Sequence, residues 1–380
     1  MSDIAKLQQL SSQMNLEPAE DLHSSPIADP GLDNVRISRA VLSDGSTIRL
    51  LKTLLSSYCD NQCAYCPFRR GRDFRRAAFT PEEFARLFVS LYQAGIVEGI
   101  FLSSGIDQRA VRAQDQLLDT AEILRKKYHY RGYLHLKILP GAEREQVYRA
   151  MCVADRLSVN LEAPTRRTLQ TLAPQKRFQQ ELIAPLLWME EIRRQHPPHH
   201  AWQGRWPSST TQYVVGPAGE SDLELLSTTH YLQQEAGLSR PYFSRFTPVL
   251  ETPLEEQPPT PPAREHRLYQ ASFLLRDYGF QVEELPFADR GNLPANLDPK
   301  TAWAKVHLAH NPVEINTADR SLLLRVPGLG PVSTEKIISA RRQTKLSSLS
   351  QLKALGIHPD RCRDYIILDG KRPLRQPRLF

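Results

Sequence analysis

Six short runs with strand character recur along the first part of the chain, and each is followed by a segment whose apolar positions have helical spacing. The runs cover residues 47–55, 99–102, 133–139, 157–161, 211–215 and 242–246. The clearest helix starts with Thr80 as N-cap and Pro81 at the first helical position, and Gly95 ends it. Repeated strand–helix units predict an α/β fold with a parallel sheet and right-handed crossovers. The pattern leaves open whether this sheet is doubly wound or forms a full or partial barrel.

The pattern changes on both sides of these units. The chain opens with a short amphipathic helix and continues as polar sequence that contains prolines, which we interpret as a loosely attached tail. After the sixth strand, six prolines between residues 248 and 262 favour extended polyproline conformation, so this segment is a stiff connector or a strap across one face. We therefore expect four parts: a tail (1–30), an α/β domain (31–262), an accessory helix with a linker (263–300) and a C-terminal domain (301–380).

Composition and charge narrow the class of protein. The chain has 380 residues, 41% hydrophobic and 24% charged, which is the mix of a folded protein with two or three domains. Residues 301–380 contain 14 Lys and Arg against 6 Asp and Glu, an excess that suits a phosphate-binding surface but also an ordinary solvated face. No apolar run approaches the roughly 18 residues of a membrane span, and no basic segment precedes an apolar stretch at the N-terminus. We expect a cytoplasmic protein without a membrane partner.

Three of the five cysteines stand close together, directly after the first predicted strand. Cys59, Cys63 and Cys66 have the spacing C-x3-C-x2-C, so their thiolates can converge on one metal centre. Zinc normally takes a fourth protein ligand, which a distant His23, His129 or His135 could supply. An iron–sulfur cluster held by three cysteines would instead leave one iron open to another ligand. The cysteine pattern therefore fits a metal centre in a reducing compartment better than it fits a disulfide framework.

This stretch resembles the radical SAM superfamily, in which the motif is C-x3-C-x-aromatic-C and Tyr65 fills the aromatic position. The resemblance implies a partial (β/α)6 barrel in which the three cysteines hold a 4Fe-4S cluster. It also implies that the open iron binds the amino and carboxylate groups of S-adenosylmethionine, with Tyr65 against the adenine. The family's Gly-Gly-Glu run after strand two is replaced by a sequence without the glutamate. The further cofactor contacts that the resemblance implies at strand ends are Ser103, Ser104, Gly105, Asn160, Glu162, Gln212, Val215 and Gly216.

An arginine-rich stretch follows the cysteine loop directly. It contains Arg69, Arg70, Arg72, Arg75 and Arg76, with Phe74 among them. Guanidinium groups beside a reaction site can clamp phosphates in a bidentate manner, and an aromatic ring can stack on a base. The alternative is a charged surface loop that pairs with acidic neighbours.

The C-terminal domain contains two predicted helices joined by a tight turn over residues 326–330. Its glycines, Gly328 and Gly330 on either side of Leu329, permit a backbone that presents N–H groups at the start of the second helix, where they can bind a phosphate. Lys336 and Arg341 lie near enough in sequence to add charge.

This pattern resembles the helix-hairpin-helix motif of DNA-binding and repair proteins. A second, less exact unit follows, with its turn at residues 355–357 and without the second glycine. The expected fold is thus a partial barrel followed by a small all-α helix-hairpin-helix domain. A hairpin that binds protein is the alternative.

As a whole, the chain resembles a bacterial family of radical SAM proteins associated with DNA modification or repair. The resemblance implies reductive cleavage of S-adenosylmethionine to a 5′-deoxyadenosyl radical, which removes hydrogen from DNA. It further implies an electron donor such as flavodoxin or ferredoxin, and a uracil-DNA-glycosylase-like partner. Two alternatives stay open: the same chemistry on transfer or ribosomal RNA, and a non-enzymatic iron–sulfur protein that binds DNA.

Overall fold

The computed structural model describes residues 2–12, 14, 35, 37–41, 45–107 and 110–373, and the chain forms two compact units. The first unit comprises Met1–Glu220 and Tyr231–Pro261, and the second comprises Ser221–His230 and Pro262–Phe380. None of the helices in the described part of the chain has both the length and the apolar character of a membrane span.

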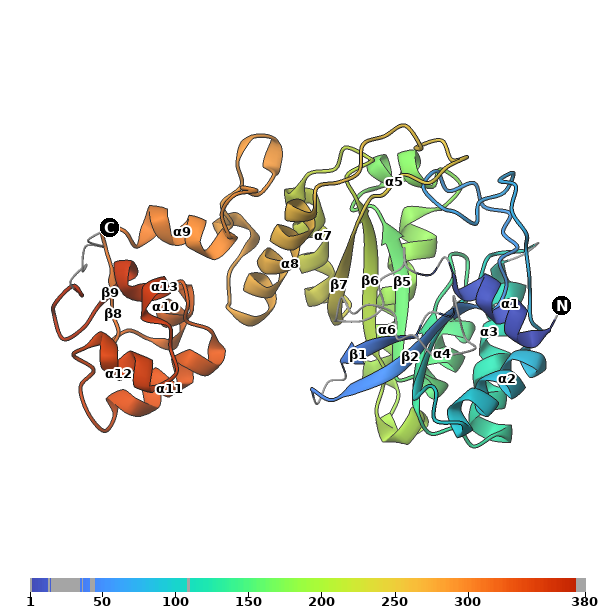
Figure 1. Cartoon of the computed structure of the whole chain (residues 1–380), viewed down its shortest axis with the longest axis horizontal. Coiled ribbons are helices and arrows are strands. Elements are labelled where there is room, and N and C mark those ends of the chain that lie inside the picture. The colour runs from blue at the N-terminus through green and yellow to red at the C-terminus, as the bar shows by residue number, and fades with distance from the viewer. Residues whose placement is uncertain are drawn as a thin grey trace. The chain divides into compact units, whose positions relative to one another are not determined.

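A single curled sheet forms the centre of the first unit (Figure 1). Its strands lie in the order of the sequence: β1 (Ile37–Val41), β2 (Thr47–Leu54), β3 (Gly99–Ser103), β4 (Tyr133–Lys137), β5 (Arg156–Glu162), β6 (Ser208–Val215) and β7 (Leu238–Arg245). Strand β1 is antiparallel to β2, and all the following neighbours are parallel. Because each crossover advances by one strand in the same direction, the helices cover one face and the sheet is a partial barrel, as predicted. The antiparallel β1 was not expected.

Helices connect the parallel strands and form the outer layer. They are α2 (Pro81–Gln93), α3 (Ala110–Glu122), α4 (Arg144–Val153), α5 (Arg166–Leu172), α6 (Ala184–Gln195) and α7 (Asp222–Glu235), with shorter turns η2 (Ile123–Lys127), η3 (Phe178–Ile183), η4 (Pro198–His200) and η5 (Trp202–Gly204). Helix α2 begins as predicted, because Thr80 and Glu83 form a reciprocal capping box and Pro81 occupies the first turn.

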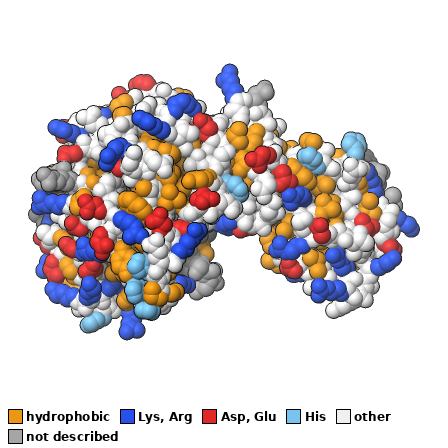
Figure 2. Space-filling model, turned by 180° about the vertical axis from the view of Figure 1, so that it is seen from behind, with side chains coloured by type: hydrophobic (Ala, Val, Ile, Leu, Met, Phe, Trp, Pro, Cys, Tyr) orange, Lys and Arg blue, Asp and Glu red, His pale blue; other side chains and the backbone are white. Residues whose placement is uncertain are grey.

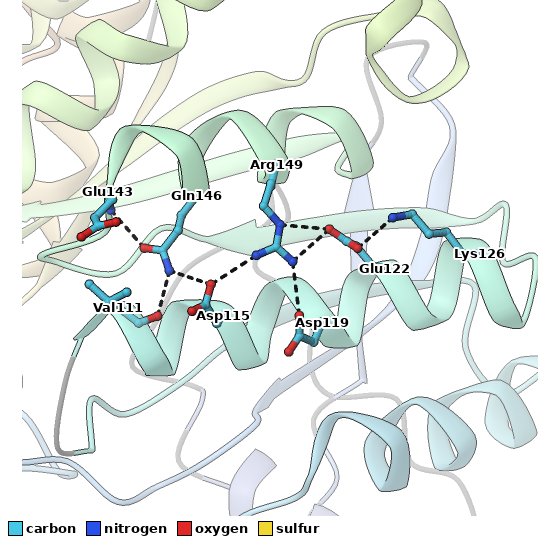
Figure 3. Close-up of polar contacts among 8 residues, drawn as sticks. All are labelled: Val111, Asp115, Asp119, Glu122, Lys126, Glu143, Gln146 and Arg149. Carbon is cyan, nitrogen blue, oxygen red and sulfur yellow. Dashed lines mark hydrogen bonds and ion pairs between the residues drawn. The ribbon is translucent and has the colours of Figure 1, made fainter.

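Polar contacts fix α4 against α3 on the outside of the barrel (Figure 3). The guanidinium of Arg149 lies 3.2 Å from Asp115, 3.2 Å from Asp119 and 3.1 Å from Glu122. The amide of Gln146 donates to Asp115 over 2.8 Å. One arginine therefore pairs with a row of carboxylates spaced along α3, which sets how far α4 is shifted along its neighbour.

The side chains of the strands alternate between two different environments. In β4, Leu134 and Leu136 are completely buried among apolar neighbours, whereas His135 and Lys137 project to the opposite face. Strand β5 repeats this alternation with Leu157 on the apolar face. The apolar face packs under the helices, so the concave face of the sheet is the polar one.

The expected N-terminal tail begins as a docked helix, α1 (Asp3–Ser11). Leu7 and Leu10 are fully buried, and the hydroxyl of Ser11 donates to the carbonyl of Lys52 over 2.6 Å. These contacts attach α1 to β2 by the same apolar periodicity that predicted the helix. Most of the remaining tail lies outside the described residues.

The proline-rich segment after β7 is a strap rather than a free connector. The backbone N–H of Thr260 donates to the carbonyl of Phe246 over 2.9 Å, and its hydroxyl donates to the carbonyl of Val215 over 2.6 Å. The segment therefore leaves the sheet and returns to it within the first unit.

The second unit is mainly helical. It contains α8 (Pro262–Asp277), α9 (Pro299–His307), α10 (Arg320–Arg325), α11 (Pro331–Arg341), α12 (Leu349–Ala354) and α13 (Pro359–Cys362), with turns η6 (Val282–Glu284), η7 (Asp289–Gly291) and η8 (Arg363–Tyr365). Two short strands, β8 (Val313–Glu314) and β9 (Ile366–Ile367), pair in parallel and close this unit, a detail that the all-α expectation missed.

Candidate functional site

The three clustered cysteines lie on the loop that follows β2 and line one cavity of about 160 Å³. All three are free thiols; Cys63 is buried, and Cys59 and Cys66 are half-buried. The loop is fixed at the carboxyl ends of the strands, because Leu55 N–H donates to the carbonyl of Ser103 over 2.8 Å. Chemistry in parallel β/α folds is found at this edge of the sheet.

Residues from three other strand ends share this cavity with the cysteines. Of the expected cofactor contacts, the cavity is lined by Tyr65, Ser103, Ser104, Gly105, Asn160, Glu162 and Gln212. Gly105 also has a steric role, because a Cβ there would lie 2.1 Å from the carbonyl oxygen of Tyr58. Residues separated by about 150 positions in the sequence thus meet in one place.

Val215 and Gly216 do not line the cavity. Val215 is fully buried, and its carbonyl accepts the hydroxyl of Thr260. Gly216 has a φ of +114°, and a Cβ at this position would lie 1.9 Å from Oγ1 of Thr260. Both residues therefore contact the strap at Thr260. Their role in cofactor binding stays a prediction, and no contact with the cavity supports it.

A buried ion pair that the sequence did not predict lies beside the cysteines. Lys176 Nζ is 2.9 Å from Oε1 of Glu162, and both side chains are almost completely buried. Burial alone would lower the pKa of Lys176, but the neighbouring Cys63 and Glu162 raise it above its ordinary value. Gln175 donates its amide to Sγ of Cys63 over 3.3 Å. The chain comes back to the cavity after α5, and this places Gln175 and Lys176 beside Cys63 and Glu162.

The cavity also contains polar groups that lack partners. Oε2 of Glu162 and Oε1 of Gln212 are buried and accept no hydrogen bond from the described residues. Burial raises the pKa of both Cys63 and Cys66 above the ordinary value of a thiol. A bound cation would favour the thiolates instead.

The donor set fits a cluster held by three cysteines, with a polar ligand beside it. Three thiols approach from one loop, and unpartnered acceptors approach from β5 and β6. Among the described residues, no three His, Cys, Asp or Glu side chains are grouped so as to hold a single metal ion. Of the histidines considered as a fourth zinc ligand, His129 and His135 do not line the cavity, and His23 lies outside the described residues.

Two of the five loop arginines, Arg72 and Arg76, make structural contacts through their guanidinium groups. Arg76 donates to the carbonyl of Ser57 over 2.7 Å and to that of Arg69 over 2.8 Å. Arg72 donates to the carbonyl of Leu250, in the strap, over 2.9 Å. Arg69 is half-buried. Arg72 and Arg76 therefore stabilise the cysteine loop, and Arg72 attaches it to the strap.

Phe74 is not free to stack on a base. The guanidinium of Arg76 lies 4.3 Å from its ring centroid, and the ring of Phe68 packs edge-on at 6.0 Å. Arg70 and Arg75 are exposed and are the arginines of this loop that remain accessible to a phosphate.

The predicted C-terminal hairpin is present as α10, the turn and α11. Gly328 has a φ of +82°, and a Cβ there would lie 2.6 Å from Cβ of Arg361 on α13. Gly330 is the N-cap of α11 and has an extended backbone. The second predicted turn is also present, with Gly356 at a φ of +77°. Gly328 is thus required by the packing of the two hairpins against each other.

The two cations predicted to assist the hairpin make contacts within the unit. Lys336 donates to the carbonyl of Leu355 over 3.0 Å, which caps α12. Arg341 donates to the carbonyls of Ile315 and Ala318 over 2.8 and 2.7 Å. On the right-hand lobe of Figure 2, which is the second unit, basic, acidic and hydrophobic side chains are interspersed.

The turn of the first hairpin also receives a buried lysine that sequence reasoning missed. Lys300 Nζ donates to the carbonyl of Leu329 and lies 4.6 Å from the ring centroid of Tyr278. Burial lowers the pKa of Lys300 to about 7. No local pattern distinguishes this lysine from a surface residue at a helix start.

Comparison with protein families finds one motif, which lies in the second unit. Residues 309–360 match the family model of the helix-hairpin-helix motif. No curated protein matches the chain.

Among solved structures, the hydrogenase maturase HydG from Carboxydothermus hydrogenoformans is 15% identical over 60% of this chain and 51% of its own, with a TM-score of 0.45. Streptococcus suis SuiB, solved with S-adenosylmethionine, is 14% identical over 60% and 47%, with a TM-score of 0.43. OxsB, a cobalamin-dependent S-adenosylmethionine radical enzyme, is 11% identical over 83% and 51%, with a TM-score of 0.35. The chain spans about half the length of each of these proteins.

Proposed function

We propose that this protein is a radical SAM enzyme that acts on DNA. The observation that supports it best is the cavity at the carboxyl ends of the strands, where Cys59, Cys63 and Cys66 meet polar residues from β3, β5 and β6. When bound and reduced, a 4Fe-4S cluster with S-adenosylmethionine supplies a 5′-deoxyadenosyl radical that removes hydrogen from a substrate. An electron donor such as a flavodoxin or ferredoxin would provide the electron.

The residues of the cavity have distinct tasks in this proposal. The three thiolates would hold the cluster, and Tyr65, which lines the same cavity, would contact the adenine of S-adenosylmethionine. Asn160 and Gln212 offer polar atoms to the cofactor from β5 and β6. The ion pair of Lys176 and Glu162 balances charge next to the thiolates. The apolar walls exclude water, which protects a reactive radical from side reactions.

Cleavage of S-adenosylmethionine tests this proposal directly. Protein reconstituted with iron and sulfide without oxygen, then reduced, is expected to form 5′-deoxyadenosine slowly without substrate and faster with DNA, as measured by mass spectrometry. A reduced, cluster-loaded protein that forms none under either condition would instead favour the non-enzymatic iron–sulfur protein. Parallel incubations with transfer and ribosomal RNA distinguish the RNA alternative.

The proposed DNA contact rests on the C-terminal hairpins and on local charge. Residues 301–380 carry 14 Lys and Arg against 6 Asp and Glu, and a helix-hairpin-helix motif is matched within them. The first N–H groups of α11 have no partner within the helix and can bind a phosphate. Such contacts are made with the phosphate backbone of DNA and not with the edges of its bases, so binding should not depend on the DNA sequence. The association with a uracil-DNA-glycosylase-like protein remains an expectation from the resemblance.

Val332 offers a sharper test of the hairpin than its glycines do. It lies in the first turn of α11 and is 71% exposed, so its replacement leaves the core intact. We expect Val332→Glu in the full-length protein to weaken duplex DNA binding by about three- to tenfold and to reduce the slope of log affinity against log salt by about 1. Because an acidic side chain at a helix N-terminus is stabilising, the unfolding midpoint should not fall.

Val332→Gln serves as the matched neutral control and should bind DNA nearly as the wild type does. Fluorescence anisotropy at several salt concentrations measures both quantities. Equal binding by the Glu variant and the wild type would assign the hairpin to a protein partner.

A further inference from the structure

A buried lysine lies against the first hairpin turn of the second unit. Lys300 is in the first turn of α9 and is 9% exposed, and its Nζ donates to the carbonyl of Leu329. The ring centroid of Tyr278, which directly follows α8, lies 4.6 Å from the same nitrogen. The start of α9, the end of α8 and the turn therefore meet at this ammonium.

The ammonium of Lys300 has few partners for a buried charge. A protonated lysine carries three N–H donors. Within the described part of the chain, Lys300 has the carbonyl of Leu329 as its one acceptor and forms no ion pair. Burial of a charge without an ionic partner is costly, and a neutral donor could bind the same carbonyl without that cost. The lysine is therefore better explained by an anion that binds at the turn.

A second polar group lies at the same turn. A Cβ at Gly330, the N-cap of α11, would lie 3.2 Å from the hydroxyl oxygen of Tyr278. This hydroxyl makes no hydrogen bond with any residue that the structure describes. Leu329, whose carbonyl binds Lys300, directly precedes Gly330. An ammonium and a hydroxyl thus lie beside the point at which α11 presents its first N–H groups.

The charge of Lys300 depends on what lies beside it. Burial lowers the pKa of Lys300 to about 7, and the carboxylate of Asp298, the N-cap of α9, acts in the opposite direction. Tyr278 contacts the lysine from the end of α8, α13 places Arg361 against the turn, and the turn itself (326–330) contains no titratable side chain. An anion at the turn would raise the pKa of Lys300 and favour its charged form.

The acids of the neighbouring elements already have cationic partners. Glu284 of η6 lies 2.7 Å from the guanidinium of Arg325. Glu335 of α11 lies 2.7 Å from the guanidinium of Arg320. Neither acid therefore serves as the counter-charge of Lys300.

We propose that Lys300, with the hydroxyl of Tyr278, forms part of the site at which the first hairpin binds a phosphate of DNA. This inference rests on the proposed function and adds to it two residues and a coupling of DNA binding to a proton. A phosphate at the start of α11 would supply the acceptors and the counter-charge for Lys300. Because the bound phosphate favours the ammonium, Lys300 takes up a proton when DNA binds near neutral pH.

The pH dependence of duplex binding by the full-length protein tests this site. At constant ionic strength, the affinity of the wild type for a fluorescein-labelled DNA duplex should fall by about three- to tenfold between pH 6.5 and 8.5, because the free protein loses a proton that the complex retains. Lys300→Met should bind more weakly than the wild type at pH 6.5 and should lack this fall. Histidines titrate in the same range, so the quantity compared is the difference between the two pH profiles, measured by fluorescence anisotropy.

Three further variants separate charge, hydroxyl and position. Arginine stays protonated throughout this range, so Lys300→Arg should bind at pH 8.5 about as tightly as the wild type does at pH 6.5. Tyr278→Phe keeps the ring and removes the hydroxyl, and should weaken binding by about two- to fivefold. Lys305→Met, on an exposed lysine of the same helix, is the matched control and should keep the pH dependence of the wild type.

Calorimetry measures the proton itself. At pH 7.5, the binding enthalpies in two buffers with different heats of ionisation should show that the wild type takes up roughly half a proton more than Lys300→Met or Lys300→Arg.

Thermal unfolding separates this site from a purely structural role of Lys300. The pKa of Lys300 in the folded protein lies below that of an ordinary lysine, so the unfolded chain binds more protons and stability should rise with pH above about 7. A lysine that only stabilised the turn would make DNA binding independent of pH or weaker at low pH. The phosphate site makes binding tighter at low pH, where the ligand-free protein is less stable.

Two results overturn the role of Lys300: parallel pH profiles of the wild type and Lys300→Met, or equal proton uptake by both. If Val332→Glu still weakened DNA binding in that case, the proposed hairpin contact would survive without Lys300. Absence of duplex binding by the wild type at low salt would refute the role of Lys300 and the DNA contact together, whereas formation of 5′-deoxyadenosine without substrate would still support the radical chemistry.

Discussion

Replacement of Cys59, Cys63 and Cys66 together with alanine is expected to remove essentially all iron and sulfide from the protein and to abolish formation of 5′-deoxyadenosine. The three thiols are the cysteines that line the cavity, and the two other cysteines do not. Once the thiolates are lost, the remaining polar groups of the cavity offer no soft ligand for iron. Iron and sulfide analysis, together with electron paramagnetic resonance of the reduced protein, measures the loss.

Cys152→Ala is the matched control for this experiment. Cys152 is a half-buried free thiol on α4 that does not line the cavity, so its replacement should leave the cluster and its activity intact. Retention of a full cluster by the triple variant would refute the assignment. So would stoichiometric zinc in a wild type prepared with ample iron, because that result would favour the zinc alternative.

Lys176→Met is expected to destabilise the first unit by about 3–5 kcal/mol, the usual cost of removing one partner from a buried ion pair. The substitution leaves the carboxylate of Glu162 buried without its ammonium partner. Denaturant unfolding of the cluster-free protein measures the change. Because the cost arises from the unpaired charge, the double variant Lys176→Met with Glu162→Gln should recover much of the stability.

Lys126→Met provides a contrast, because Lys126 belongs to an exposed ion pair. Lys126 lies 2.8 Å from Glu122 with a side chain that is 71% exposed, so the loss should stay below about 1 kcal/mol. If Lys176→Met were equally mild, the ion pair would not stabilise the cavity, and its proposed role beside the thiolates would lose its support.

Local patterns were sufficient to predict most elements and the clustering of the three cysteines on one loop. The spacing of Cys59, Cys63 and Cys66 and the cap at Thr80 depend on residues a few positions apart. The two hairpin turns follow the same rule, since glycines at Gly328 and Gly356 permit backbone conformations that other residues avoid. Such signals survive in the sequence because the atoms that produce them are neighbours along the chain.

The sequence of β4 also contains a signal for the polar inner face of the barrel. Strands buried on both faces normally have continuous apolar sequences, yet β4 alternates leucines with His135 and Lys137. That alternation indicates that one face of the strand meets something other than an apolar core. It does not say which neighbouring strands contribute to the same face.

The arrangement in space depended on contacts between distant residues. The choice of a partial barrel over a doubly wound sheet lies in the direction of each crossover, which local spacing does not encode. The pairing of Lys176 with Glu162 and the contact of Arg72 with the carbonyl of Leu250 likewise join separate segments. Long basic side chains look alike in a sequence, and the backbone that surrounds each one determines whether it fixes a loop, as Arg72 does, or pairs with a buried acid, as Lys176 does.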